Sequence, residues 1–337
     1  MAVGKVARRT VVADVTALLN SPELSALVAE LDESGDKRGR KGYGARALLG
    51  ACLVKSMFAL PTWTFVAALI AEHPGLQDAL GGCPSVWAMY RFSVKLRAHS
   101  PLIEATLGGI VSALRAELPE YGTDIAIDAS DIPAWGNGHR TVYDGGPERE
   151  RYSDPDASWG HRSAVGTRGA GGFYGFKIDL AVCTATGLPL AWQTRSARHH
   201  ESLFVAPLLD AVRARGFRPE TCAMDKGYDN TRIYGECEAR GVDPVVPLRG
   251  AKSKQPALPL TTGGRLFPRI ARHTERFRSL YRRRALIEKE FAHLKREHGL
   301  AALRVRGLER VQLHADLTML ARLSLAMQRE RVATLAA

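Results

Sequence analysis

Residues 171–202 read GGFYGFKIDLAVCTATGLPLAWQTRSARHHES. Apolar side chains occupy alternate positions in the first half of this stretch: Phe176, Ile178, Leu180 and Val182. Lys177 and Asp179 fall between them, so the pattern predicts a strand with one buried face and one polar face. Thr186 and Gly187 form a turn signal, and the segment LPLAWQTRSA at 188–197 is expected to be the returning strand of a β-hairpin.

The segments on both sides of this hairpin predict a mixed sheet. The run DIAID at 124–128 is short and β-branched, as a strand requires, whereas 131–171 is rich in Gly, Ser, Asp and Arg and is read as a long loop. Six further elements are expected after the hairpin: helix 201–215, strand 221–224, helix 230–240, strand 243–248, a long helix over 275–298 and a last helix over 308–330. Antiparallel strands followed by βαβ units give an α/β fold, a mixed sheet with flanking helices, and this order is the one expected of a ribonuclease-H-like core over 121–330.

The first 120 residues are expected to form a separate helical region. The most apolar window, 47–71, contains Lys55 and is broken by Pro61, so we read it as two buried helices and not as a membrane span. Thr62 is expected to cap one helix, and Ser85 another with the sequence VWAMYRFSVKLR. The basic residues of that second helix favour a DNA-binding region over 1–120. A packing or dimerisation subdomain is the alternative.

Composition narrows the function classes. The chain has 337 residues and a formal net charge of +12, which favours a polyanionic partner, nucleic acid before a membrane surface. Its five cysteines form no CxxC pair, which indicates a reducing compartment, and we expect a cytoplasmic protein. No GxxxxGK[ST] or GxSxG motif occurs, which disfavours ATP-driven and nucleophile-elbow chemistry.

Three acidic residues stand where such a sheet would gather them. Asp128 ends the first strand, Asp225 follows the fourth in the sequence AMDKGYDN, and Glu288 lies on the long helix. Carboxylates brought together from distant segments repel one another unless a metal ion binds them, and hard oxygen ligands suit Mg²⁺ or Mn²⁺. Asp131, in IDASDIP, is a rival first acid; we prefer Asp128 because it ends the β-patterned run, whereas Asp131 is expected to begin the loop. A turn or capping role is the alternative for Asp225.

The long helix carries a second pattern. Four side chains fall on one arc of about 60° at 100° per residue: Tyr281, Arg284, Glu288 and Lys295. A surface ion pair of Arg284 with Glu288 would explain only two of them. Cations beside a metal-binding carboxylate are useful where a phosphate backbone passes over it. Lys226 and Tyr228 follow Asp225 closely and are candidates for DNA contact, with packing as an equal alternative for Tyr228. Lys177 is a further candidate for phosphate contact, with a solvated lysine as the alternative. A basic loop over 249–272 could also track DNA.

At these residues the chain resembles a known family. The spacing Tyr281-x2-Arg284-x3-Glu288-x6-Lys295 resembles the YREK signature of bacterial insertion-sequence transposases of the DDE type. AMDKGYDN is similar to their second-aspartate motif, and residues 172–202 are similar to their hairpin motif, with His200-Glu201 where His-Asp is usual. We read Glu201 as an acidic residue of a helix start and not as a fourth ligand. The resemblance covers about residues 45–330.

The resemblance implies a metal-dependent DNA transposase. Asp128, Asp225 and Glu288 would bind Mg²⁺ (or Mn²⁺), while Tyr281, Arg284 and Lys295 would contact phosphates at the element end. The enzyme would cleave the element's terminal repeats to free a 3′-hydroxyl and join it to target DNA by two-metal phosphoryl transfer. Double-stranded DNA is the implied partner, bound by a homodimer, with no membrane involved. The alternatives are a nuclease that cleaves without strand transfer and a catalytically silent, transposase-derived DNA-binding protein.

Overall fold

The structure is a computed structural model that describes residues 10–34, 42–136, 138, 154–162, 169–249 and 264–336. The chain divides into two compact units. One consists of Met1–Ile110, Arg296–Ala302 and Leu313–Ala337, and the other of Val111–Lys295 and Leu303–Gln312.

The first unit is helical. It contains α1 (Val11–Leu19), α2 (Pro22–Glu33), α3 (Ala45–Met57), α4 (Trp63–Glu72), α5 (Pro74–Leu80) and α6 (Val86–Ala98). Hydroxyl side chains begin several of these helices, because each accepts the N–H three residues further on: Thr10, Ser21, Thr62 and Ser85. The helix starts predicted at Thr62 and Ser85 are therefore confirmed.

Two long helices contribute residues to both units: α7 (Ser100–Glu117) and α12 (Leu308–Ala336). None of the described helices is by itself both long and apolar enough to cross a membrane. The pair α1 and α2 satisfies that test only when its halves are joined, and the pair is bent by 65°.

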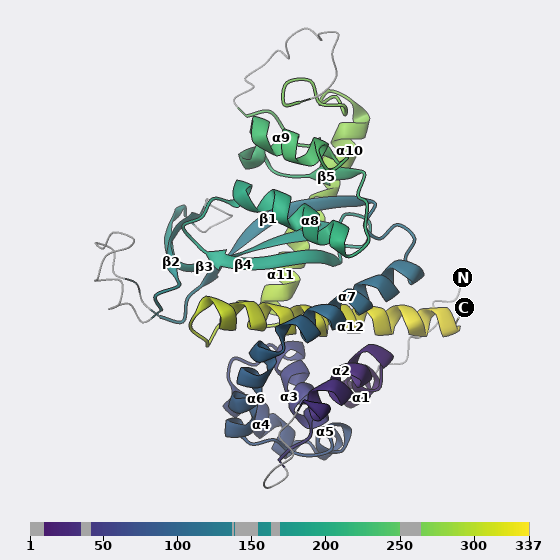
Figure 1. Cartoon of the computed structure of the whole chain (residues 1–337), viewed down its shortest axis with the longest axis vertical. Helices are drawn as coiled ribbons and strands as arrows, with labels where there is room; N and C mark the ends of the chain where they lie inside the picture. Colours follow the sequence, from purple (N-terminus) through teal and green to yellow (C-terminus); the bar gives the residue numbers. More distant parts are fainter. Residues whose placement is uncertain are drawn as a thin grey trace. The chain divides into compact units, whose positions relative to one another are not determined.

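The second unit is built on a mixed sheet, drawn in Figure 1. Its described strands are β1 (Asp124–Pro133), β2 (Ser158–Arg162), β3 (Gly171–Cys183), β4 (Pro189–Ser196), β5 (Thr221–Ala223) and β6 (Asp243–Val245). The strand order is β2-β3-β1-β5-β6, with β4 also paired to β3. Strands β1 to β4 pair antiparallel, whereas β1, β5 and β6 pair parallel. The predicted hairpin is β3–β4, and its turn contains Gly187 at φ 74°.

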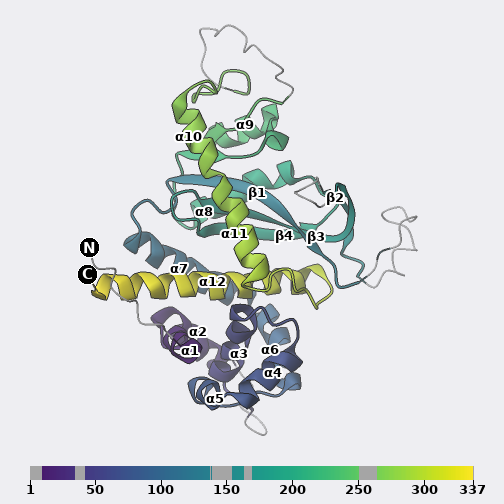
Figure 2. The ribbon, with the colours of Figure 1, turned by 180° about the vertical axis from the view of Figure 1, so that it is seen from behind.

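Helices cover both faces of this sheet. Helix α8 (Val205–Ala214) packs on β3 and β4, and α10 (Glu275–Arg283) packs on β5 and β6. Figures 1 and 2 show α8 on one face and α11 (Ala285–Arg296) on the other. The second unit is thus a mixed α/β fold with flanking helices, as the sequence predicted.

Three details of the sequence reading are wrong. Strand β1 does not end at Asp128 but continues to Pro133, because β3 begins at Gly171 and pairs with β1 as far as Gly175. Part of the supposed loop 131–171 is therefore strand, and β2 lies within it; residues 137, 139–153 and 163–168 lie outside the described part. Strand β3 is covered on both faces, so Asp179 is not on a solvated side.

The long helix is also not continuous. It consists of α10 and α11, separated at Arg284. The Arg284 N–H donates to the Tyr281 carbonyl at 3.0 Å, and the Ile287 N–H donates to the Arg284 carbonyl at 3.0 Å. These i→i−3 bonds tighten the turn, as in a 3₁₀ segment.

Candidate active site

The parallel pairing of β1 with β5 aligns two of the predicted acids. In this ladder Asp124 is level with Thr221, and Ala126 is level with Ala223. Continuing the register by two residues places Asp128 level with Asp225, on the same face, because side chains alternate along a strand. Neighbouring strands lie about 4.8 Å apart, so this register brings the two carboxylates near each other. Consistently, the charge of Asp225 raises the pKa of Asp128.

The turn after β5 fixes the direction of Asp225. Asp225 is the N-cap of the 3₁₀ helix η3 (Lys226–Tyr228), and its Oδ1 accepts the Gly227 N–H at 2.6 Å. A Cβ atom at Gly227 would lie 2.8 Å from that same oxygen, so any other residue there would displace the carboxylate. The DKGY sequence thus provides the acid and the space it needs.

Arg284 connects the other two acids. Its guanidinium donates to Asp128 Oδ2 at 3.1 Å and to Glu288 Oε1 at 2.5 Å. The ring of Tyr281 lies 5.7 Å from the Arg284 Cζ, measured to the ring centroid. Arg284 therefore lies at the helix break and bonds to Asp128 of β1. Glu288 is exposed, and its bond to Arg284 connects it to the site.

Asp128 lies in an environment that disfavours its charged form. Burial raises its pKa to about 7, which outweighs the lowering effects of the Ala129 N–H and the Arg284 guanidinium. The negative charges of Asp225 and Glu201 add to the increase.

Lys295 contacts β1 further along its length. Its ammonium donates to Ser130 Oγ at 2.7 Å and to the Asp131 carbonyl at 2.6 Å, and lies 3.4 Å from Asp131 Oδ1. Asp131 is also 3.5 Å from Arg162 and lies opposite Lys177 in the β1–β3 ladder. Asp131 is three residues from Asp128, so the register that aligns Asp128 with Asp225 does not include it.

The remaining predicted DNA contacts lie in different places. Lys226 is exposed and directly follows Asp225. Lys177 is partly buried in β3. In the sheet it lies opposite Arg195 of β4 and Asp131 of β1. Arg284 and Lys295 contact β1, and Tyr281 lies beside Arg284, whereas Lys177 belongs to the sheet itself. Glu290, two residues from Glu288, is only 4% exposed and lies 3.5 Å from His293.

The site contains two residues that the sequence reading did not assign to it. Glu201 begins the 3₁₀ helix η2 (Glu201–Phe204), and its Oε1 would lie 3.2 Å from a Cβ at Gly227. Tyr228 is fully buried, and its hydroxyl has no hydrogen-bond partner within the described structure. Burial raises its pKa well above the usual value, and the charges of four carboxylates add to the effect: Asp128, Glu201, Asp179 and Asp225. The sequence signals for them were the hairpin motif, in which Glu201 was read as a helix-start acid, and the Tyr in DKGYD, which packing explained equally well.

A buried ion pair supports the turn that carries Glu201. Arg195 donates to Asp179 through Nε at 2.5 Å and Nη2 at 2.8 Å. Its Nη1 donates to the His199 carbonyl, and its Cζ lies 4.6 Å from the centre of the Phe204 ring. One arginine thus ties β3 to the segments on both sides of Glu201.

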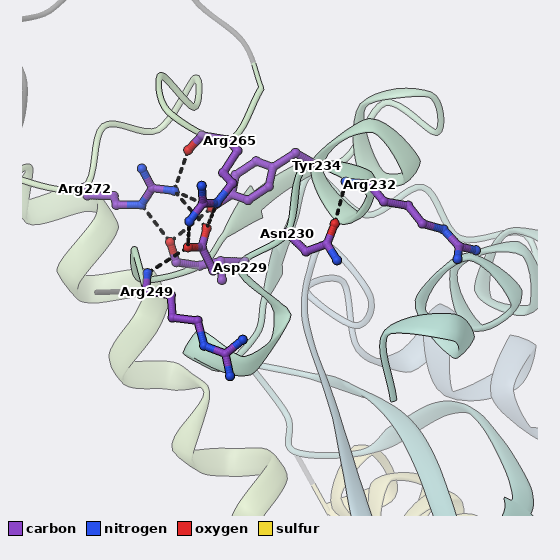
Figure 3. Close-up of polar contacts among 8 residues, drawn as sticks. Asp229, Asn230, Arg232, Tyr234, Arg249, Arg265 and Arg272 are labelled. Atoms are coloured by element: carbon purple, nitrogen blue, oxygen red, sulfur yellow. Dashed lines mark hydrogen bonds and ion pairs between the residues drawn. The ribbon is translucent and has the colours of Figure 1, made fainter. Parts of the chain in front are cut away.

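A second cluster, shown in Figure 3, anchors the turn that carries Asp225. Asp229 accepts hydrogen bonds from Arg265 at 3.0 and 2.7 Å and from the Arg249 N–H at 2.7 Å. Burial alone would raise its pKa, but these hydrogen bonds and the nearby Arg272 lower it below the usual value. Part of the basic loop is therefore structural; its members Lys252 and Lys254 lie outside the described residues.

The donor chemistry of this site fits a hard divalent cation. Carboxylate oxygens suit Mg²⁺ or Mn²⁺. The buried Tyr228 hydroxyl has no hydrogen-bond partner in the described structure, as expected where a bound ion or its water would supply one. Within the described ranges, no three His, Cys, Asp or Glu side chains converge closely enough to hold an ion. Arg284, bound to both Asp128 and Glu288, neutralises the acids in this arrangement.

Comparison with known proteins agrees with this geometry. No curated protein matches the chain. A family model described as "Transposase DDE domain" matches residues 122–324, more than half of the chain and a range that contains Asp128, Asp225 and Glu288. The chain therefore belongs to the family of transposases with a DDE domain.

Proposed function

We propose that this protein is an insertion-sequence DNA transposase of the YREK type, of bacterial origin, with a ribonuclease-H-like catalytic domain. It binds the terminal repeats of its element, cleaves them to free a 3′-hydroxyl and joins that hydroxyl to target DNA. The observation that carries the proposal is the parallel β1–β5 pairing, which ends two residues before Asp128 and Asp225, together with Arg284, which links Asp128 to Glu288.

Asp128, Asp225 and Glu288 are the proposed ligands for Mg²⁺ or Mn²⁺. Such ions, when bound, supply the Lewis acidity that activates the attacking oxygen and stabilises the leaving oxygen of a phosphodiester. The protein's contribution is to place the acids: β1 carries Asp128, the η3 turn holds Asp225 against Gly227, and α11 carries Glu288. The register favours Asp128 over Asp131 as the first acid.

The cations beside the acids are proposed to bind the phosphates of the element end. Arg284 has a planar guanidinium suited to phosphate, and Tyr281 packs beside it. Lys295 and Lys226 would add positive charge along the same DNA strand. Lys177 lies within the sheet, which makes it the weakest of the five candidates for DNA contact.

The helical region over 1–120 is proposed to provide additional DNA contacts. On α6 the side chain of Trp87 is 73% exposed, Tyr90 and Val94 are also exposed, and Arg91 lies beside them. Aromatic and basic residues on one exposed helix are suited to a polyanionic surface. We further propose that the enzyme acts as a homodimer on DNA, since a dimer provides one catalytic site for each end, and that it works in the cytoplasm.

The direct test is incubation of the full chain with a labelled terminal-repeat duplex, with and without Mg²⁺. Asp225→Asn and Glu288→Gln should abolish cleavage and leave end binding intact. Glu309→Gln, an exposed acid at the start of α12, is the matched control and should cleave normally. Cleavage at the normal rate in both site variants would contradict the proposed triad.

The products separate the remaining possibilities. Joined products containing target DNA support the transposase. Cleaved ends that never join target DNA would indicate a nuclease, and salt-sensitive end binding without cleavage in any divalent cation would indicate a silent DNA-binding protein.

A further inference from the structure

Glu201 lies beside Asp225, although 23 positions separate the two in the sequence numbering. The same point above Gly227 is 2.8 Å from Asp225 Oδ1 and 3.2 Å from Glu201 Oε1. The two oxygens are therefore no more than 6.0 Å apart, the sum of those distances. The side chain of Glu201 also affects Asp128, whose pKa its charge raises. Two carboxylates from separate segments thus meet above Gly227, and the charges of both raise the pKa of the third, Asp128.

The Tyr228 hydroxyl provides a second, independent observation. It is buried, it has no hydrogen-bond partner within the described structure, and the charges of the site's carboxylates raise its pKa. Carboxylates accept hydrogen bonds and a phenol donates one, so a tyrosine close to four acids would ordinarily be paired. A buried polar group without a partner calls for an explanation, and a bound ion or its water is a common one.

The backbone around Glu201 is firmly held. His200 caps η2 through its side chain, which accepts the Ser202 N–H at 3.2 Å. Arg195, itself fixed by Asp179, donates to the His199 carbonyl and packs on Phe204. Glu201 therefore projects from a braced turn, and its approach to Asp225 follows from the fold.

From this geometry we propose that Glu201 is a fourth acidic ligand of the divalent-cation site, acting with Asp225 and Asp128. The inference rests on the proposed function. Its physical reason is that carboxylates held this close repel each other until a cation binds between them. A helix-start role accounts for the position of Glu201 in η2, but not for its position over Gly227.

The test measures Mn²⁺ binding to the full chain without DNA. Binding is monitored by isothermal titration calorimetry and by the loss of the electron paramagnetic resonance signal of free Mn²⁺. Glu201→Gln, which keeps the side-chain shape, should weaken Mn²⁺ binding roughly tenfold or more, as should Asp225→Asn. Glu201→Asp should recover much of the affinity because the carboxylate is restored. Glu309→Gln, also an acid in the first turn of a helix, should bind like the wild type.

A second measurement uses the unaltered protein and does not depend on the folding of a variant. When Fe²⁺ occupies a divalent-cation site, addition of ascorbate and peroxide cleaves the backbone next to the bound ion. Cleavage is expected at 200–202 as well as at 225–228, and Mg²⁺ should suppress both.

The outcomes separate the inference from the proposed function. If Asp225→Asn loses Mn²⁺ while Glu201→Gln binds like the wild type, Glu201 is not a ligand and the cation site stands without it. If both variants bind like the wild type, the proposed cation site itself is wrong. Fe²⁺ cleavage confined to 225–228 would overturn the assignment of Glu201 by itself.

Discussion

Removing one member of the Asp179–Arg195 pair should destabilise the second unit far more than removing both. Asp179 is 1% exposed and Arg195 is 3% exposed, and two hydrogen bonds of 2.5 and 2.8 Å join them. Burial raises the pKa of Asp179 even though Arg195 lowers it, so the pair does not fully offset the loss of hydration. Asp179→Leu leaves Arg195 as an unpaired buried charge, which costs about 3–5 kcal/mol.

The double variant is the informative one. In Asp179→Leu with Arg195→Met no buried charge remains, so stability should return to within about 2 kcal/mol of the wild type; the lost bond from Arg195 to His199 accounts for about 1 kcal/mol of the remainder. For a unit of this size the single variants should lower the melting temperature by about 6–20 °C.

Urea denaturation followed by circular dichroism measures these differences. Arg278→Met removes an exposed ion pair with Glu275 and should cost at most about 1 kcal/mol, which makes it the control. Arg195→Met has a further signature. Without its partner, Asp179 has a pKa raised above its value in the unfolded chain. The loss of unfolding free energy caused by Arg195→Met therefore grows as the pH rises above the unfolded pKa, and it should be smaller at pH 5 than at pH 7.5. Single variants that cost less than about 1 kcal/mol, or a double variant as unstable as the sum of the singles, would refute the reasoning.

Three further predictions follow from single sites. Gly175→Ala should destabilise the β1–β3 pairing by about 1–3 kcal/mol, because a Cβ there would lie 2.4 Å from the Ile132 carbonyl oxygen. Gly171→Ala is the control, since a Cβ there meets open space, and it should change stability by less than about 0.5 kcal/mol. Equal effects of the two variants in thermal melts would contradict this. Burial, with a smaller effect from Lys55, lowers the pKa of His314 to about 4. The unfolded state then binds the proton first, so the first unit should lose about 2 kcal/mol between pH 7.5 and pH 5, and His314→Gln should remove that part of the dependence; an unchanged pH profile of unfolding would count against it. Lys295→Ala should weaken end binding and reduce the slope of log affinity against log salt by about 1, and an identical slope would argue against a phosphate contact.

Local chemistry in the sequence predicted the parts of the fold that depend on nearby residues. The β3–β4 hairpin follows from alternation and the Thr186-Gly187 turn, and the starts of α4 and α6 follow from hydroxyl caps at Thr62 and Ser85. The acid at the end of β5 could be placed because Asp225 follows an apolar run directly. All of these depend on contacts within a few residues along the chain.

Tertiary structure alone decided how far β1 extends and what surrounds its acids. The polar sequence DASD gives no strand signal, and only the partner β3, some 50 residues away, keeps it extended. Asp179 looked solvated because its partner Arg195 lies on the next strand. Glu201 does begin a helix, as the sequence indicated, but its approach to Gly227 was not visible because Gly227 is distant in sequence. A carboxylate's environment is set by groups that fold against it, and residue spacing along one chain segment carries no information about those groups.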